Sequence, residues 1–245
     1  MTNFWLNEAV KVLLWYSSAY LLGLLAVRRG VAVNYTRKIF LITMFLFPQA
    51  LASLVPFKAS LGTSAVSWLV FLGCTLTLCE PLRSRSGFLA TAFAAIDRPE
   101  DRPFTLTWLT TQILVTYAVF VVMLLWLGRY EKTALAYIMV LVMGVGDALA
   151  EPVGYRFGRH KYRTRALFTE RTYTRSLEGS ACVLLSAVLA ILLVGEHLTG
   201  PQFWLALFVI PPVVTVAEAL SPHTWDGPFL YLTGGGATVA VLELA

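Results

Sequence analysis

The sequence predicts an all-α membrane protein with seven or eight transmembrane helices, and its composition and charge pattern are the observations behind this prediction. Of the 245 residues, 58% are hydrophobic and only 13% are charged, whereas a soluble domain carries about 25% charged residues. The mean hydropathy is +0.71, and the charges cluster between long apolar runs. We therefore expect one integral membrane domain over residues 1–245.

Eight apolar runs have roughly the length that a bilayer requires of a helix. The first run ends at Arg28-Arg29 without a small-residue cleavage site, which favours a membrane helix over a signal peptide. Pro211-Pro212 interrupts the seventh run and Gly234-Gly235-Gly236 the eighth, so seven spans with a re-entrant end are the alternative count. The predicted spans are residues 9–27, 39–57, 62–82, 104–128, 133–151, 179–195, 201–220 and 227–244.

The basic residues predict the orientation of these spans. Fifteen of the 19 lysines and arginines lie in the first, third and fifth loops, and the positive-inside rule assigns these loops to the cytoplasm. With eight spans, both termini then lie on the opposite side. No aromatic-interleaved RNA motif accompanies the +5 charge, so nucleic-acid binding is not expected. The compact size favours a bacterial inner membrane.

Carboxylates gather at the predicted cytoplasmic ends of the spans. Glu80 ends span three, Asp147 and Glu151 end span five, and Glu218 lies near the end of span seven. Asp226 falls in the next cytoplasmic loop, at the same depth. Carboxylates at a membrane boundary are costly and often functional. We therefore expect Asp147, Glu151, Glu218 and Asp226 to converge on one site.

Asp147 and Glu151 have the spacing of a metal site. Residues four apart lie on the same face of a helix. Two neighbouring carboxylates repel each other unless a cation or a proton separates them, and magnesium prefers such hard oxygen ligands together with phosphates and water. The alternative is that both residues form structural ion pairs with arginines of the following loop.

The segment 146–180 also carries glycines and a strongly basic loop. Glycines permit close approach of a phosphate or of another helix, and arginine binds phosphate bidentately. Most of the loop cations need no ligand beyond the positive-inside rule. Arg175 differs, because it precedes Ser176 and the Gly179-Ser180 start of the next span, where a helix N-terminus can bind phosphate. The two serines are expected to be helix-start residues rather than nucleophiles.

The same segment resembles the CTP-dependent polyprenol kinases, integral membrane proteins that include dolichol and phytol kinases. The similar elements are GDALAE (146–151), GYRFGRHK (154–161) and RSLEGS (175–180), followed by EALSPHTWDGP (218–228). Arg37-Lys38 is similar to an Arg-Lys element that precedes the second helix of the family. The resemblance covers residues 130–245 best. Three positions depart from the family pattern. Arg175 replaces a lysine, Gly227 replaces an asparagine and Leu41 replaces a histidine.

The resemblance implies phosphoryl transfer from CTP to the hydroxyl of an isoprenoid alcohol in the membrane, with Mg²⁺ as cofactor. It implies Mg²⁺ ligation by Asp147 and Glu151, and catalytic roles for Asp147, Glu218 and Asp226, the last two as a second ligand or the base. The residues implied in binding the nucleotide are Gly146, Gly154, Arg156, Gly158, Lys161, Arg175, Ser176, Gly179 and Ser180.

Two alternatives stay open. One is a cytidylyltransferase of the CDP-diacylglycerol synthase type, which is disfavoured because Trp225-Asp226-Gly227-Pro228 stands where that family has a His-Gly-Gly and Asp-Arg-x-Asp element. The other is a non-catalytic membrane relative or a transporter. The sequence does not identify the acceptor lipid.

Overall fold

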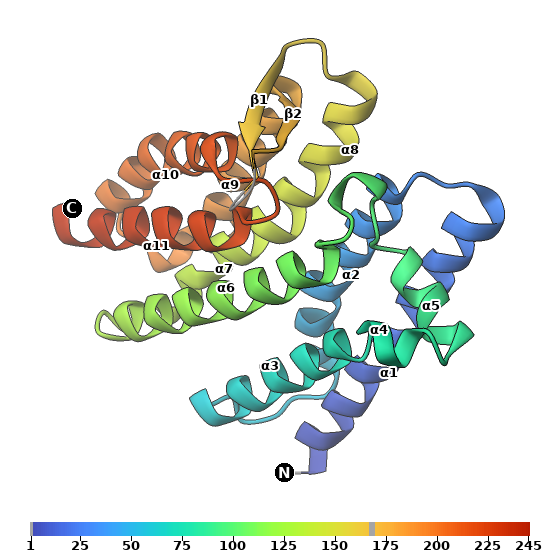
Figure 1. Cartoon of the computed structure of the whole chain (residues 1–245). Helices are drawn as coiled ribbons and strands as arrows, with labels where there is room; N and C mark the ends of the chain where they lie inside the picture. The colour runs from blue at the N-terminus through green and yellow to red at the C-terminus, as the bar shows by residue number, and fades with distance from the viewer. Residues whose placement is uncertain (1, 167–169) are drawn as a thin grey trace. The chain divides into compact units, whose positions relative to one another are not determined.

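The computed structural model describes residues 2–166 and 170–245 and is almost entirely helical (Figure 1). Six of its helices are long and apolar enough to cross a membrane, which agrees with a multi-pass helical membrane protein. They are Asn3–Arg29, Val33–Leu54, Thr105–Gly128, Thr133–Phe157, Leu177–His197 and Gly200–Leu220.

The other two predicted spans are also helices, but neither is among these six. α3 (Leu61–Leu76) is apolar but has only 16 residues. α11 (Asp226–Leu244) has 19 residues and contains the glycine triplet without a break. α10 (Gly200–Leu220) likewise continues through Pro211-Pro212. Each of the eight predicted spans thus contains a helix, but the third ends at Leu76 rather than at residue 82, and a count of eight crossings stays a prediction.

The chain divides into two compact units, residues 1–111 and 112–245. The first unit contains α1 (Thr2–Arg29), α2 (Val33–Leu54), α3, α4 (Glu80–Arg83), α5 (Gly87–Ala94) and η1 (Pro99–Asp101). α1 packs against α2, α3 and α5 around a core that includes Trp15, Phe40 and Phe93. Glu80 is exposed and forms an ion pair with Arg83.

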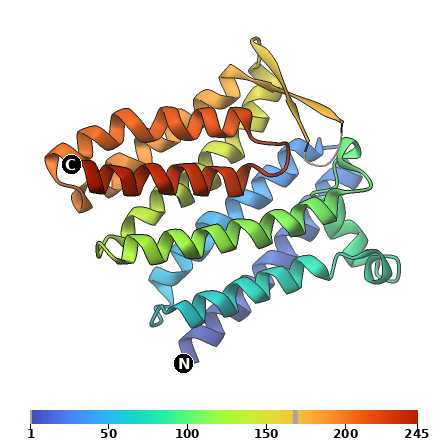
Figure 2. The ribbon, with the colours of Figure 1, turned by 60° about the vertical axis from the view of Figure 1, so that its left-hand side comes forward.

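The second unit is built around the helix α9 (Leu177–Val194). α6 (Thr105–Gly128) leads into it, followed by η2 (Thr133–Leu135), α7 (Ala136–Leu141), η3 (Val142–Asp147) and α8 (Ala148–Phe157). The strands β1 (Lys161–Arg165) and β2 (Thr172–Ser176) precede α9 (Leu177–Val194), η4 (Gly195–His197), α10 and α11. α9 packs against α7, η3, α8 and α10, and its residues Val183, Ala187 and Ile191 are fully buried. Figure 2 shows α10 and α11 side by side, as their close packing requires.

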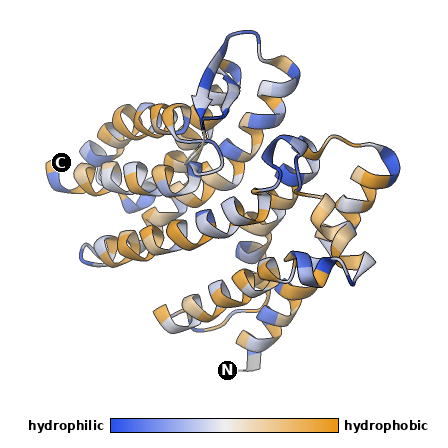
Figure 3. Cartoon of the chain, in the orientation of Figure 1, coloured by the Kyte–Doolittle hydropathy of each residue, from blue (hydrophilic) through white to orange (hydrophobic). Residues whose placement is uncertain are grey.

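The glycine triplet of α11 serves close packing within the second unit. A Cβ atom on Gly234 would lie 2.2 Å from Met139 Sδ, and one on Gly235 would lie 2.8 Å from Met123 Sδ. Gly236, in contrast, faces open space. In Figure 3, hydrophobic residues dominate the long helices, and hydrophilic residues gather in the hairpin and at helix ends.

Candidate functional site

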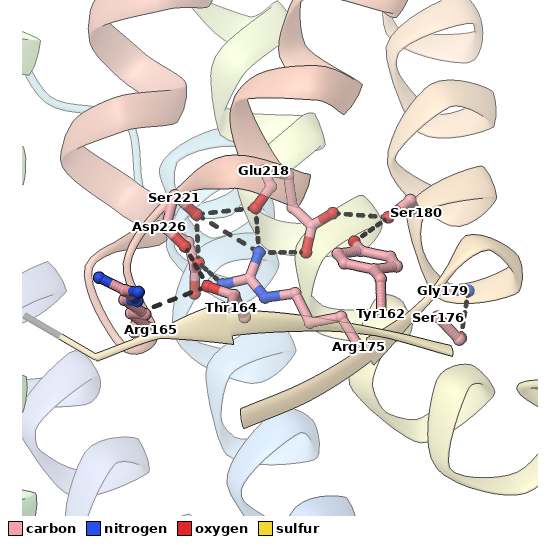
Figure 4. Close-up of polar contacts among 10 residues, drawn as sticks. All are labelled: Tyr162, Thr164, Arg165, Arg175, Ser176, Gly179, Ser180, Glu218, Ser221 and Asp226. Carbon is pink, nitrogen blue, oxygen red and sulfur yellow. Dashed lines mark hydrogen bonds and ion pairs between the residues drawn. The ribbon is translucent and has the colours of Figure 1, made fainter. Parts of the chain in front are cut away.

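The basic segment after α8 forms a β-hairpin, where the sequence predicted a loop. KYRTR and TYTRS pair antiparallel, with Tyr162 opposite Arg175 and Thr164 opposite Tyr173. Side chains alternate between the two faces of a strand. Lys161, Arg163 and Arg165 are exposed, whereas Thr164 is buried and Tyr162 half-buried. The hairpin therefore directs Tyr162, Thr164 and Arg175 towards the helices (Figure 4).

Arg175 is the centre of a buried polar network. Its Nη1 donates to Glu218 Oε1 at 2.7 Å and also to the Glu218 main-chain oxygen, while Nη2 pairs with Asp226 Oδ1 (Figure 4). The side chain of Glu218 is only 5% exposed, and those of Arg175 and Asp226 are 12% and 13% exposed. One guanidinium thus joins β2 to the last turn of α10 and the first residue of α11.

Hydroxyl groups complete this network. Ser180 Oγ, on α9, donates to Glu218 Oε2 at 2.9 Å, and Tyr162 Oη lies 2.7 Å from Ser180 Oγ. Ser221 Oγ lies 2.6 Å from Asp226 Oδ1, and Thr164 Oγ1 donates to the Ser221 carbonyl at 3.0 Å. Each oxygen of the Glu218 carboxylate therefore has a donor, as a buried charge requires.

A third carboxylate, that of Asp147, lies near the network. Asp147 is 4% exposed and lies within electrostatic range of both Arg175 and Glu218. Burial lowers the pKa of Arg175, but Asp226 and Glu218 outweigh this effect and raise the pKa overall. Burial and, to a smaller extent, Glu218 raise the pKa of Tyr162. Two carboxylates thus contact the Arg175 guanidinium, and a third is near enough to influence it.

Three of the four carboxylates expected to converge are thus close together. Asp147 ends the π-helical segment η3, a type of helix that often occurs at functional sites. Asp226 is the first residue of α11 rather than a loop residue, and the N-terminus of a helix favours its negative charge. Glu151 lies one turn after Asp147 on α8 and is half-buried.

The metal prediction can be compared with the donor set. Within residues 2–166 and 170–245, no group of three or more His, Cys, Asp or Glu side chains is arranged to hold a metal ion. Magnesium usually takes one or two carboxylates and completes its shell with water and phosphates. The carboxylate oxygens of Asp147 and Glu151 are the kind of ligand that this requires, and their role as ligands stays a prediction.

The glycines expected to bind the nucleotide lie at close contacts between helices. A Cβ atom on Gly146 would lie 2.1 Å from Ser186 Oγ, and one on Gly179 would lie 2.6 Å from the Ala150 carbonyl oxygen. A Cβ atom on Gly154 would lie 2.9 Å from Ser176 Oγ, and one on Gly158 would lie 2.8 Å from the same oxygen. These contacts explain the glycines by packing of η3 and α8 against α9, and their role in phosphate binding stays a prediction.

The remaining predicted residues lie around the start of α9. Ser176 caps this helix by accepting a hydrogen bond from Gly179 N at 3.1 Å, which confirms it as a helix-start residue. Ser180 instead belongs to the buried network. Arg156 and Lys161 are exposed, and in the described part of the chain no contact joins them to Arg175.

A second set of contacts fixes the hairpin to the loop between α10 and α11. His223 N donates to the Arg165 carbonyl at 2.9 Å, and the Tyr173 and His223 rings stack with centroids 3.5 Å apart. Sequence reasoning missed Tyr162, Thr164, Tyr173, Ser221 and His223. The signal for the first three was the alternation of threonine and tyrosine with basic residues, which is typical of strands.

In comparisons with known proteins, no family model matches this chain, and neither a curated protein nor a solved structure does.

Proposed function

We propose that the protein is a CTP-dependent lipid kinase that phosphorylates the hydroxyl of an isoprenoid alcohol at the cytoplasmic boundary of the membrane. The observation that carries this proposal is the gathering of Asp147, Glu218 and Asp226 around the buried Arg175. These residues come from four separate elements, η3, β2, α10 and α11. Glu218 lies in the last turn of α10, and Asp147 lies within the candidate membrane helix Thr133–Phe157, which continues ten residues beyond it. The motif elements GDALAE and RSLEGS supply two of the four residues.

Phosphoryl transfer suits such a site because it depends mainly on positioning and on charge stabilisation. The lipid hydroxyl oxygen forms a bond to the γ-phosphorus of CTP, the bond from that phosphorus to the β–γ bridging oxygen breaks, and CDP leaves. The hydroxyl proton passes to the carboxylate of Glu218 or Asp226. Magnesium held by Asp147 and Glu151 would neutralise phosphate charge, and Arg175 orients the two other carboxylates.

The location of the network also supports this function. A lipid alcohol keeps its hydroxyl near the membrane surface, whereas CTP remains in water. If the ends of α10 and α11 lie at the membrane surface, as proposed, the two substrates would meet beside Glu218 and Asp226. Burial of Glu218 and Asp226 keeps water away from the reacting oxygen, which limits hydrolysis of CTP.

One observation favours a second candidate, a non-catalytic relative. Arg175 already has two carboxylate partners, so the network can act as a purely structural tie between β2, α10 and α11. Direct binding of CTP in the presence of magnesium separates this candidate from an enzyme.

Asp147→Asn tests the proposal. A catalytic or metal-binding role requires the charge of Asp147, so CTP- and polyprenol-dependent turnover should fall at least 100-fold. The thermal midpoint should stay unchanged or rise, because one of three neighbouring carboxylates is neutralised. Glu243→Gln, at an exposed carboxylate near the end of α11, is the control and should keep full turnover.

A structural role for Asp147 predicts the opposite pattern. The midpoint of Asp147→Asn would then fall, and turnover would decrease only in proportion to the folded fraction. Measuring both quantities on the same purified, detergent-solubilised variant distinguishes the two roles.

A further inference from the structure

The two faces of the β1–β2 hairpin have different surroundings. The inner face supplies Tyr162, Thr164 and Arg175 to the buried network (Figure 4). On the outer face, the exposed Arg163 and Arg165 lie opposite Thr174 and Thr172. Neither strand contains a carboxylate, and among the described residues neither of these two guanidinium groups has a carboxylate partner. The outer face of the two strands therefore carries positive charge, and the acidic residue nearest to it in the sequence is Glu170, just before β2.

The ends of the hairpin are held level with the ends of membrane helices. At its base, β1 follows α8 after three residues, and β2 continues directly into α9. Towards its tip, Thr164 and the Arg165 carbonyl are hydrogen-bonded to Ser221 and His223, in the loop that joins α10 to α11. The hairpin consequently lies along the helix ends instead of projecting away from them.

Exposed apolar side chains border the base of the hairpin. Tyr155 and Phe157 at the end of α8 are 66% and 61% exposed, and Leu177 at the start of α9 is 59% exposed. Tyrosine and other amphipathic aromatic residues concentrate where a membrane helix meets the lipid headgroups. These residues place the adjacent arginines within reach of headgroup phosphates, since long cationic side chains extend towards the interface.

We propose that the outer face of the hairpin, defined by Arg163 and Arg165, binds the headgroups of anionic phospholipids. Arginine forms bidentate hydrogen bonds with phosphate, and the negative surface of the membrane attracts basic residues next to a membrane helix. Lipid binding at this face would hold the hairpin against the helix ends and thereby keep Arg175 in place. The proposal does not depend on the protein being a kinase.

Binding of two short-chain lipids to the purified full chain in detergent tests this assignment. The probes are dioctanoyl phosphatidylglycerol, which is anionic, and dioctanoyl phosphatidylcholine, which is zwitterionic with the same chains. Each basic residue near an anionic surface contributes about fivefold in affinity. Arg163→Gln/Arg165→Gln should therefore reduce the preference for phosphatidylglycerol by about 25-fold, and salt should reduce the preference of the wild type.

Two control variants isolate the effect of this face. Thr172→Gln/Thr174→Gln changes the same surface without changing its charge. Arg28→Gln/Arg29→Gln removes two exposed charges at the end of α1. The threonine variant should keep the wild-type preference, and the Arg28→Gln/Arg29→Gln variant should lose clearly less of it than Arg163→Gln/Arg165→Gln. The proposal is overturned if Arg163→Gln/Arg165→Gln keeps it too, or if Arg28→Gln/Arg29→Gln loses as much. It is also overturned if Arg163→Gln/Arg165→Gln weakens CTP binding while leaving the lipid preference intact, because the face would then serve the nucleotide.

Discussion

Replacing Arg175 should cost far more stability than replacing its partner Glu218. Arg175→Met removes the cation that pairs with Glu218 and Asp226, and leaves these two carboxylates buried beside Asp147. Breaking a buried ion pair by removing one partner costs about 3–5 kcal/mol. Glu218→Gln instead keeps an acceptor for Arg175 and a group that can bond to Ser180, and it removes one of three clustered negative charges. We expect it to cost about 1 kcal/mol or less.

Thermal unfolding in detergent, followed by intrinsic fluorescence, measures this difference. For a chain of this size, 1 kcal/mol corresponds to about 2–4 °C in the midpoint. Arg175→Met should therefore lower the midpoint by about 10 °C, and Glu218→Gln by no more than about 4 °C. Glu80→Gln removes the charge of the exposed partner of Arg83 and is the control, with an expected loss below about 1 kcal/mol. Equal losses for Arg175→Met and Glu218→Gln would refute the role of Arg175 as the cation shared by Glu218 and Asp226.

Two further predictions concern packing and the tyrosine of the hairpin. Gly179→Ala should destabilise the protein by about 1–3 kcal/mol, because the new methyl group meets the Ala150 carbonyl. Gly236→Ala places its methyl group in open space and should stabilise α11 by up to about 1 kcal/mol. Similar thermal midpoints for the two variants would contradict this packing. Because burial raises the pKa of Tyr162 above 10.0, its contribution to stability is complete below pH 10 and is lost as the pH rises towards the folded-state pKa. The free energy of unfolding of Tyr162→Phe should be about 1 kcal/mol lower than that of the wild type near neutral pH, and it should decline less than that of the wild type above pH 10. Parallel pH profiles of the two free energies would show that Tyr162 does not titrate in this way.

The helical architecture could be predicted because a bilayer imposes a strong pattern on the sequence. Each of the eight apolar runs contains a helix, including the run with Pro211-Pro212, whose proline rings the helix accommodates. The hairpin was missed because a run of arginines was interpreted only through the positive-inside rule. The five-residue strands carry an alternating pattern, but the pattern is short. The face of the hairpin that turns inwards carries Thr164 and Arg175, whereas the inward face of a strand usually carries apolar side chains.

The candidate site could be predicted in part, from depth in the membrane. Placing Glu218 and Asp226 at the same helix ends as Asp147 was enough to expect them together, and the structure joins Glu218 and Asp226 through Arg175. The partner of Arg175 could not be predicted, because the sequence does not show whether an arginine near a helix start faces a ligand or a carboxylate. The hydroxyl groups of Ser180 and Ser221 acquire their roles only from the packing of α9 and α10.

The transfer of label from CTP to a polyprenol tests the central claim most directly. Purified protein in detergent is incubated with magnesium, a polyprenol, phosphatidic acid as the acceptor that a cytidylyltransferase requires, and CTP labelled at either the γ- or the α-phosphate, and the lipids are then extracted. A lipid kinase transfers the γ-label alone, with Asp147→Asn as the inactive control and Glu243→Gln as the active one. Appearance of the α-label in the lipid would indicate a cytidylyltransferase, and absence of both labels despite intact folding would contradict the assignment as a kinase.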